Sequence, residues 1–338
     1  MNGKGQNTRT DDVNKTIVWI PAGDRSTPSS RLRVYDVAEA LEQQYGVKNI
    51  FPPFQLASCP RAVFVQKVCD RSLFPMLKQL KEKNCRCLYD LCDPIWLQTE
   101  VNRRRNWSVD EMVAIADEII TPTTAMAKAV TSRYKNCKCR VIADSIAMHA
   151  PEFRAPKKHI KKERLMIGWI GTALNMVHLP MIAEPLKRLN ALHPIVLRLI
   201  TASHNGMIPA LPEIPVEFIP WSLHDHLRYL SECDIIVIPM SITEGTATKS
   251  QNRLQLAWAL GIPAVFSPIE SYLELVVGQA HLGKIAETPE EWAVHLLNLV
   301  SPEERNAIGR EAHALILKEH SLAVRLPLWA DAVLGPTA

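Results

Sequence analysis

The stretch T-K-S-Q-N-R-L-Q-L-A-W-A-L-G-I-P, residues 248–263, has the start and stop signals of a helix. Thr248 and Gln251 have the spacing of a capping box, and Gly261 followed by a proline is a typical helix stop. We therefore expect a helix that begins near Lys249.

Two fixed positive charges stand at the start of this predicted helix. Lys249, Asn252 and Arg253 are spaced i, i+3 and i+4, so they share one face of the first two turns. Cations at a helix N-terminus oppose the helix dipole, whereas an anion placed between them reverses that sign. The pattern indicates either a phosphate site or a solvated basic turn.

Outward from this stretch, short β-branched or apolar runs alternate with helical patterns along the whole chain. This alternation is typical of parallel α/β layers. The expected strands are residues 16–20, 62–66, 85–90, 118–122 and 139–143 in the first half, and 165–170, 196–200, 216–220, 235–239 and 264–267 in the second. The expected helices of the first half are residues 33–45, 73–83, 109–117 and 125–134. The sequence therefore predicts an α/β protein with two doubly wound, Rossmann-like parallel-sheet domains.

Composition shifts give the expected boundaries. The domains are a flexible tail at 1–14, a first domain at 15–150, a polar and proline-bearing linker at 151–164, a second domain at 165–321, and a C-terminal helix at 322–338 that packs back on the first domain.

Length and charge fit an ordinary globular protein. The chain has 338 residues, 47% of them hydrophobic and 22% charged, with a formal net charge of +4. The beginning lacks the apolar core of a secretion signal, and no run is long enough to cross a bilayer, so we expect a cytoplasmic protein. The net charge is too small to identify a nucleic-acid binder.

The eight cysteines include two C-x-C pairs, Cys85 with Cys87 and Cys137 with Cys139, and Cys92 follows the first pair. Zinc sites favour C-x-x-C turns, whereas these pairs stand at the starts of expected strands. Buried or edge thiols are therefore favoured over a metal site, and we expect no metal.

Ligands of open parallel sheets bind beyond the carboxyl ends of the strands. Gly171 and Thr172 follow the strand at 165–170 and precede a helix expected to carry residues 180–189. Residues 239–245 join a neighbouring strand to the cationic helix and should lie beside Gly171. The chain contains neither G-x-G-x-x-G nor a P-loop motif, which argues against nicotinamide Rossmann enzymes and P-loop NTPases.

The second half resembles the donor-binding domain of GT-B glycosyltransferases, specifically the retaining family often numbered four. The matching motifs are I-G-W-I-G-T (167–172), V-E-F-I-P-W (216–221), D-I-I-V-I-P-M (234–240), K-S-Q-N-R (249–253), A-L-G-I-P-A-V-F-S (259–267) and T-P-E-E-W (288–292). The first half matches more loosely, through S-S-R-L-R (29–33), V-F-V-Q-K (63–67) and L-Y-D-L-C-D-P-I-W (88–96).

The resemblance implies a glycosyltransferase that moves a hexose from a nucleoside-diphosphate sugar to an acceptor hydroxyl, with retention and without metal. A UDP- or GDP-sugar is the implied co-substrate, and no permanently bound cofactor is expected. Lys249 and Arg253 would stabilise the diphosphate as charge develops on it. The implied donor-binding residues are Gly171, Thr172, Trp221, Glu244, Gly245, Lys249, Asn252 and Arg253.

The chain departs from the family pattern at two glutamates. Thr248 and Leu256 occupy the places of these glutamates, the second of which binds the donor ribose, and Glu244 is nearby but out of register. A donor-binding or structural GT-B protein without transfer activity therefore stays open as an alternative.

The resemblance implies fewer candidate residues for the acceptor than for the donor. Ser30 and Arg31 lie in the first strand-to-helix loop, and His149 lies near the hinge, where a surface histidine is the alternative reading. Asp93 is a candidate catalytic group of the cleft, with an Asp-Pro turn as the alternative.

The acceptor itself stays open among a sugar, a lipid-linked sugar, a protein and modified DNA. For the last class, phage enzymes that glycosylate hydroxymethylated bases are the model. The basic runs that would line a groove for DNA are Arg103, Arg104 and Arg105 with Trp107, and Lys157, Lys158, Lys161 and Lys162.

Overall fold

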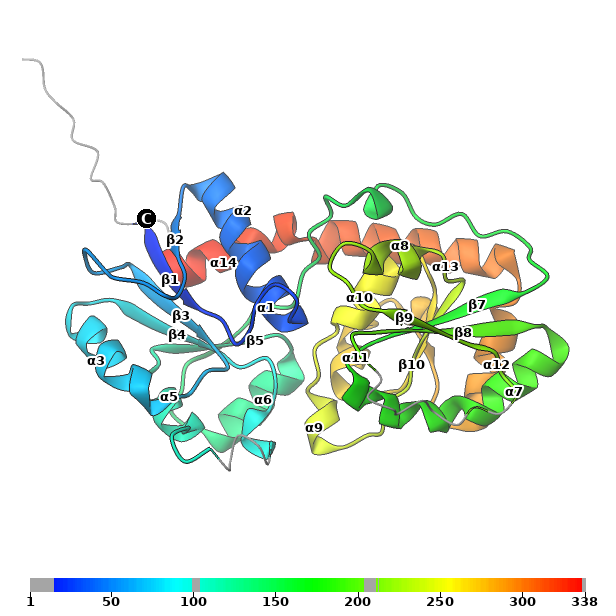
Figure 1. Cartoon of the computed structure of the whole chain (residues 1–338), viewed down its shortest axis with the longest axis horizontal. Helices are drawn as coiled ribbons and strands as arrows, with labels where there is room; N and C mark the ends of the chain where they lie inside the picture. Colours follow the sequence, from blue (N-terminus) through cyan, green and yellow to red (C-terminus); the bar gives the residue numbers. More distant parts are fainter. Residues whose placement is uncertain (1–14, 99–103, 204–210, 212, 336–338) are drawn as a thin grey trace, which may run out of the picture.

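The computed structural model describes residues 15–98, 104–203, 211 and 213–335. Two parallel sheets of six strands each stand side by side, and helices cover both faces of each sheet (Figure 1). The two halves are built from successive parts of the chain, so the α/β fold class expected from the sequence is confirmed.

The first sheet has the strand order β2-β1-β3-β4-β5-β6. Its strands are β1 (Thr16–Ile20), β2 (Lys48–Ile50), β3 (Ala62–Gln66), β4 (Arg86–Asp90), β5 (Glu118–Thr121) and β6 (Cys139–Val141). The connecting helices are α1 (Pro28–Ser30), a π-helical turn η1 (Arg31–Tyr35), α2 (Asp36–Tyr45), η2 (Arg71–Leu73), α3 (Phe74–Glu82), η3 (Ile95–Leu97), α5 (Val109–Ile115) and α6 (Thr124–Arg133). The order reverses between β1 and β3, which makes a switch point there.

The second sheet has the strand order β12-β11-β10-β7-β8-β9. Its strands are β7 (Leu165–Ile170), β8 (Ile195–Thr201), β9 (Val216–Pro220), β10 (Ile235–Ile238), β11 (Ala264–Phe266) and β12 (Lys284–Ile285). Its helices are η5 (Ala173–Ile182), α7 (Ala183–Leu192), α8 (His226–Ser231), α9 (Glu244–Ala247), α10 (Asn252–Ala259), α11 (Glu270–Leu275), η6 (Ala280–Leu282) and α12 (Pro289–Asn298). The switch point of this sheet lies between β7 and β10.

The helix expected over residues 180–189 is divided in the structure. A 3-10 helix, η5, runs through Pro180, and the α-helix α7 begins at Ala183. Pro180 cannot donate a backbone hydrogen bond, which favours the tighter turns before it and a new start after it.

The last helices connect the two halves. Helix α13 (Pro302–Leu315) and the π-helical turn η7 (Ile316–His320) lie on the second half, and α14 (Leu322–Leu334) packs on the first sheet, where Trp329 meets Phe64 with ring centroids 5.8 Å apart (Figure 1). Hydrogen bonds from Ile146 N to His320 O (3.0 Å) and from Leu322 N to Ile146 O (2.9 Å) join the two crossings of the chain. The halves are therefore connected by two paired segments.

The segment expected to be a polar linker, residues 151–164, packs along the second half. Its His159 is 3% exposed and lies with Nε2 3.0 Å from the Gly261 carbonyl, and Lys157 Nζ donates to the carbonyls of Ser231 and Cys233. The polar side chains of this segment therefore form hydrogen bonds with the backbone of the second half.

The cysteines are free thiols, and Cys69, Cys85, Cys87, Cys92 and Cys233 are buried. Among the described residues, no group of three or more His, Cys, Asp or Glu side chains is placed to hold a metal ion. Within the same residues, no helix combines the length and the apolar character needed to cross a bilayer.

Candidate functional site

The switch points of the two sheets bring together the residues that follow the central strands. In the first half these residues follow β1, β3 and β4, and in the second half they follow β7 and β10. Since ligands of doubly wound folds bind at such points, the space between these loops is the candidate site.

Arg253 lies in the first turn of α10, and its guanidinium is only partly satisfied. Nη2 lies 2.9 Å from the sulfur of Met240, while Nη1 is buried and has no hydrogen-bond partner among the described residues. A buried charged donor without a partner is costly. An anion placed at Nη1 would remove that cost.

Gly171 makes room for this guanidinium. A Cβ at residue 171 would lie 3.0 Å from the indole of Trp169 and 3.7 Å from Arg253 Nη1. The Gly171 N–H donates to Ile200 O at 3.2 Å. The absence of a side chain at Gly171 lets Trp169 and Arg253 lie close to the backbone there. The next residue, Thr172, is exposed and accepts a hydrogen bond from the Asn175 amide.

The cationic helix begins three residues later than the sequence predicts. Helix α10 starts at Asn252, so Lys249 lies in the bend that follows α9. Thr248 is buried with no partner for its hydroxyl among the described residues, and the Gln251 amide donates to the Ser271 carbonyl at 2.5 Å. Neither side chain caps α10, so the two residues form no capping box.

Lys249 reaches across the cleft to the first half. Its Nζ lies 3.1 Å from Asp93 Oδ1, and the other oxygen of Asp93 lies 3.1 Å from Lys67 Nζ. Burial alone would raise the pKa of Asp93, but Lys67 and Lys249 outweigh it and hold that pKa below its usual value. Asp93 is therefore a carboxylate between two ammonium groups.

Lys67 is a site residue that the sequence analysis missed. It directly follows β3 with φ +55°, a left-handed conformation that is uncommon for lysine, and its Nζ also donates to Ser29 Oγ at 2.9 Å. Its place at the carboxyl end of a strand is the signal that would have found it.

His178 was also missed. It projects from η5 toward the loop after β10, where its Nδ1 accepts from the Ser241 N–H at 3.3 Å and lies 3.2 Å from Ser241 Oγ. Burial, and then the charges of Arg253 and Lys249, lower the pKa of His178. We therefore expect a neutral imidazole at pH 7 with its proton on Nε2.

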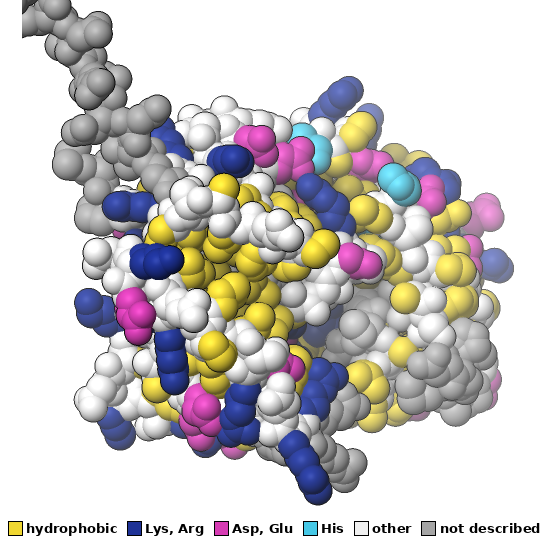
Figure 2. All heavy atoms as spheres, turned by 60° about the vertical axis from the view of Figure 1, so that its left-hand side comes forward, with side chains coloured by type: hydrophobic (Ala, Val, Ile, Leu, Met, Phe, Trp, Pro, Cys, Tyr) yellow, Lys and Arg dark blue, Asp and Glu magenta, His cyan; other side chains and the backbone are white. Residues whose placement is uncertain are grey.

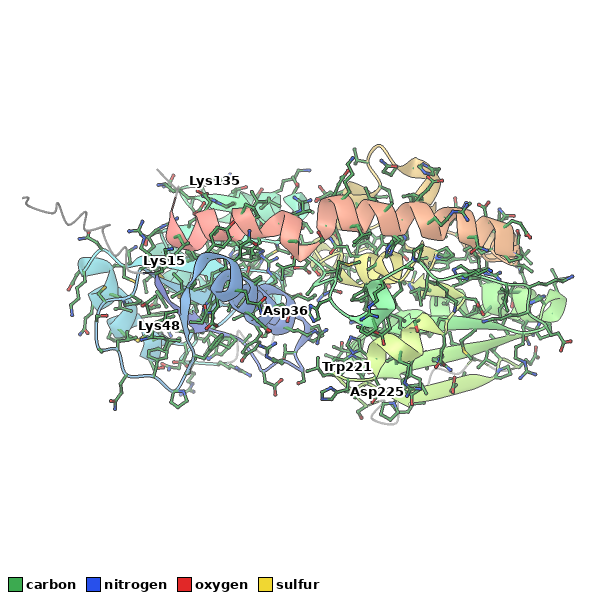
Figure 3. The ribbon with its side chains drawn as sticks, turned by 90° about the horizontal axis from the view of Figure 1, so that it is seen from above. Lys15, Asp36, Lys48, Lys135, Trp221 and Asp225 are labelled. Atoms are coloured by element: carbon green, nitrogen blue, oxygen red, sulfur yellow. The ribbon has the colours of Figure 1, made fainter. Side chains whose placement is uncertain are left out.

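Trp221 and Arg31 meet across the two halves. The Arg31 guanidinium lies 5.4 Å from the Trp221 ring centroid, and the centroid of the His226 ring lies 5.2 Å from the same point. Figure 3 shows Trp221 at the border of the second half, with Asp36 of the first half across from it. An aromatic face at the end of β9 is suited to a planar base.

The other candidate residues differ in how exposed they are and in whether their side chains are already hydrogen-bonded. Ser30 is fully buried and its hydroxyl donates to Gln66 Oε1 at 2.7 Å, so it orders its own loop. His149 and Glu244 are exposed, while Gly245 and Asn252 are half-buried near the cationic bend. Of these residues, Asn252 lies next to Arg253 at the start of α10.

The two basic runs do not form one groove. Arg104 stacks on Trp107, 4.5 Å from the ring centroid, before α5 of the first half, while Lys157 and Lys162 lie on the segment along the second half and bind its carbonyls and Asp234. Figure 1 shows these segments on opposite sides of the molecule, and Figure 2 shows Lys and Arg scattered among other side chains over one face. Arg103 lies outside the described residues.

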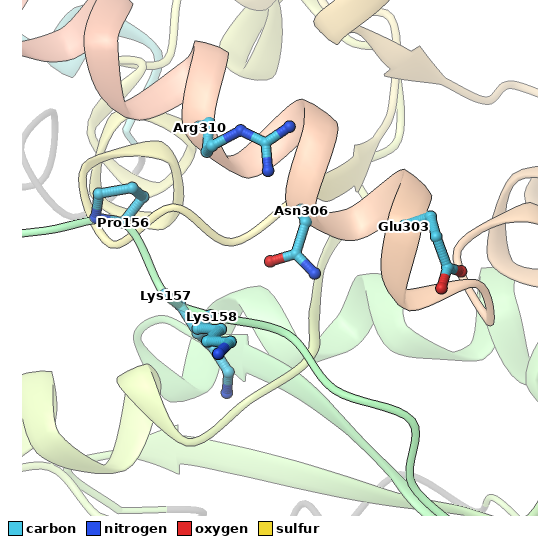
Figure 4. Close-up of a pocket in the computed structure, with 6 residues that line it drawn as sticks. All are labelled: Pro156, Lys157, Lys158, Glu303, Asn306 and Arg310. Carbon is cyan, nitrogen blue, oxygen red and sulfur yellow. The ribbon is translucent and has the colours of Figure 1, made fainter.

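A cavity of about 550 Å³ lies away from both switch points (Figure 4). It is bordered by the segment at 151–164 and α13, and its lining includes Lys157 and Asn306. The Asn306 amide is already bonded to the backbone of His159 and Pro302. These polar groups hold the segment in place, so this cavity is not the candidate site.

No protein-family model matches the chain, and no curated protein matches it. Solved structures do match over nearly the whole length. A glycosyltransferase from Rickettsia africae is 12% identical with a TM-score of 0.64, and the match covers 96% of this chain and 100% of that one.

Two further structures match in the same way. HepE from Anabaena, in complex with UDP and glucose, is 13% identical with a TM-score of 0.64, and the match covers 95% of this chain and 99% of that one. MnaA from S. aureus, solved with UDP, is 12% identical with a TM-score of 0.55, and the match covers 96% and 98%. At these identities the likeness shows the fold, and that fold is GT-B.

Proposed function

We propose that this GT-B chain is a glycosyltransferase that moves a hexose from a nucleoside-diphosphate sugar to an acceptor hydroxyl. The observation that carries the proposal is the buried Arg253 Nη1, which has no hydrogen-bond partner among the described residues and faces the switch point beside Gly171. Lys249 supplies a second cation nearby, since the charges of both Lys249 and Arg253 act on His178. A diphosphate would satisfy both groups.

In the proposed reaction the bond between the sugar C1 and the diphosphate oxygen breaks, and a bond from C1 to the acceptor oxygen forms. The electron pair of the broken bond goes to the diphosphate, where Arg253 and Lys249 stabilise the growing negative charge. Asp93, held ionised by two lysines, is a poor base. We therefore assign the acceptor proton to the leaving phosphate oxygen, which is compatible with retention at C1.

The donor base is assigned to the Trp221 face. Trp221 ends the loop after β9 and is in contact with Arg31 of the first half, so a base stacked there would touch both halves. Of the solved neighbours described above, HepE holds UDP with glucose and MnaA holds UDP. We propose a UDP- or GDP-sugar as donor, and the two side-chain cations take the place that a divalent ion holds in metal-dependent transferases.

The second candidate function is a donor-binding protein without transfer activity. It is favoured by Thr248 and Leu256, which stand where the resembling family has glutamates. Thr248 is buried with an unbonded hydroxyl, and Leu256 packs against the core of the second half, so neither offers a carboxylate to a ribose.

The experiment is a thermal-shift screen of the purified chain against UDP, GDP, ADP, TDP and their common sugars, followed by titration and by assay of donor hydrolysis. A ligand that binds only the folded state raises the melting temperature by mass action. We expect one nucleotide to bind and Arg253→Ala or Lys249→Ala to weaken its binding by about 30-fold or more, as loss of a buried charge partner does.

The matched control is Lys187→Ala, which removes a half-exposed lysine paired with Glu213 on the far side of the second half. It should leave binding unchanged. Binding with slow sugar release supports the transferase, binding without any hydrolysis or transfer supports the donor-binding protein, and no binding of any nucleotide contradicts both.

A further inference from the structure

The carboxylate of Asp93 is paired with Lys249, which is one of the two cations that the proposed donor diphosphate would bind. We propose that Asp93 is an internal anion that occupies Lys249 in the free protein and is replaced there by the donor diphosphate, and that Lys67 sets how strongly Asp93 competes. This inference rests on the proposed function for the identity of the incoming anion.

The contact joins the two halves through one shared carboxylate. Asp93 Oδ1 lies 3.1 Å from Lys249 Nζ and Oδ2 lies 3.1 Å from Lys67 Nζ. The side chains of Lys67 and Asp93 are 19% and 20% exposed, and that of Lys249 is 35% exposed. The two ammonium groups therefore divide the charge of a single, partly desolvated acceptor.

Lys67 and Asp93 are the fixed members of this group. The Lys67 N–H donates to the Asp90 carbonyl at 3.0 Å, its φ of +55° is held by the surrounding strand ends, and its Nζ has a second acceptor in Ser29. Lys249 lies in a bend between two short helices and carries a flexible four-carbon stem. Lys249 can therefore exchange Asp93 for another anion while Asp93 stays with Lys67.

Competition predicts opposite effects for two substitutions. Asp93→Asn removes the competing charge and leaves two unpaired ammonium groups facing the site, so nucleoside-diphosphate binding should become about tenfold tighter. Lys67→Met leaves the whole charge of Asp93 to Lys249, so the same binding should become about tenfold weaker. A merely structural role would weaken binding in both variants.

The first experiment needs no nucleotide. The rate at which acetic anhydride acetylates Lys249 is measured by mass spectrometry, with the 81% exposed Lys318 as internal reference. We expect Asp93→Asn to raise this rate and Lys67→Met to lower it, each by about threefold or more, because an ammonium held against a carboxylate is less free to meet the reagent. Unchanged rates, or rates that move in the same direction, overturn the inference.

The second experiment titrates UDP, GDP and inorganic pyrophosphate into the wild type and both variants by calorimetry. Asp110→Asn is the control, since Asp110 is an exposed carboxylate of α5 paired with Arg133. Opposite changes in affinity support the competition, and weaker binding in both variants overturns it. If the acetylation rates change as expected but no anion binds, the proposed function fails; if a nucleotide binds but acetylation is unchanged, the proposed function stands and this inference fails.

Discussion

A buried ionic group holds the strand ends behind the site. The Arg33 side chain is 1% exposed and lies 2.6 Å from Asp90 and 2.8 Å from Asp144. Asp144 also accepts from Ser250 of the second half, next to Lys249. Because losing one member of a buried ion pair leaves an uncompensated charge, this group constrains how the cationic bend is placed relative to the first half.

Asp36, at the start of α2, gives a prediction for pH. Burial raises the pKa of Asp36 to about 6, although Arg31, Arg25 and His149 partly oppose it. The folded state therefore holds the Asp36 proton more tightly than the unfolded state does. The contribution of this protonated carboxyl to the free energy of unfolding is complete below pH 3.8 and is lost as the pH rises through 6.

The Asp36→Asn variant should therefore be more stable than the wild type at pH 8 by about 1–3 kcal/mol, and this difference should vanish near pH 4. Urea unfolding followed by circular dichroism between pH 4 and pH 8 checks it. Glu39→Gln on the same helix, with a side chain 56% exposed, is the control and should follow the wild-type profile. A constant difference at all pH values would show that Asp36 acts through packing.

At the residue scale, charge at a predicted helix start is the signal that made two of the cations candidates. Arg253 and Lys249 were found in this way. Lys67 was missed although it follows a predicted strand, because the sequence does not show that its backbone is left-handed or that its side chain meets Asp93. His178 was missed for the same reason, since its partner Ser241 lies on a different loop.

At the scale of elements, strands were predictable where the sequence has a run of about five β-branched or apolar residues. The strands β1, β3, β7 and β9 have the predicted bounds, whereas the edge strands β2 and β12 were missed. The edge strands are two or three residues long and half-exposed, so their sequences carry no apolar run. The start of α10 was misplaced because the Gln251 side chain binds the Ser271 carbonyl and the Thr248 hydroxyl caps no N–H of the helix.

Helix α14 is the element that ties the end of the chain to the first half. Trp329 is 1% exposed, lies over the Phe64 ring, and has the Arg33 guanidinium 5.1 Å from its centroid. We expect Trp329→Ala to lower the free energy of unfolding of the first half by about 3–5 kcal/mol, because it opens a large cavity.

Urea unfolding and limited proteolysis of α14 measure this effect. Leu328→Ala, one residue away and 41% exposed, should cost well under about 1 kcal/mol. Equal losses in the two variants would mean that α14 contributes through helix propensity and not through the tryptophan.

At the scale of the whole molecule, the two switch points face one another and exchange contacts. Lys67 and Asp93 come from one and Arg253 and Gly171 from the other, while Lys249 bridges them. The two chain crossings pair at Ile146 and Ser321, on one side of the interface between the halves. On the other side the halves meet through side-chain contacts. The geometry of the site therefore depends on how firmly those contacts hold the halves together.

One such contact is made by Glu274 of α11, whose carboxylate accepts from the N–H groups of Thr124 and Ala125 at 2.9 Å and 2.6 Å. It caps helix α6 of the other half and complements the dipole of that helix. Glu274→Ala should speed amide exchange at residues 124 and 125 by about tenfold, since a helix cap contributes about 1–2 kcal/mol. Hydrogen-exchange mass spectrometry measures it.

Glu270→Ala is the matched control, because its pair with Lys128 is exposed at 52% and 67% and such pairs contribute little. If both variants exchange alike, Glu274 does not hold the halves together and the site is positioned by the two chain crossings alone.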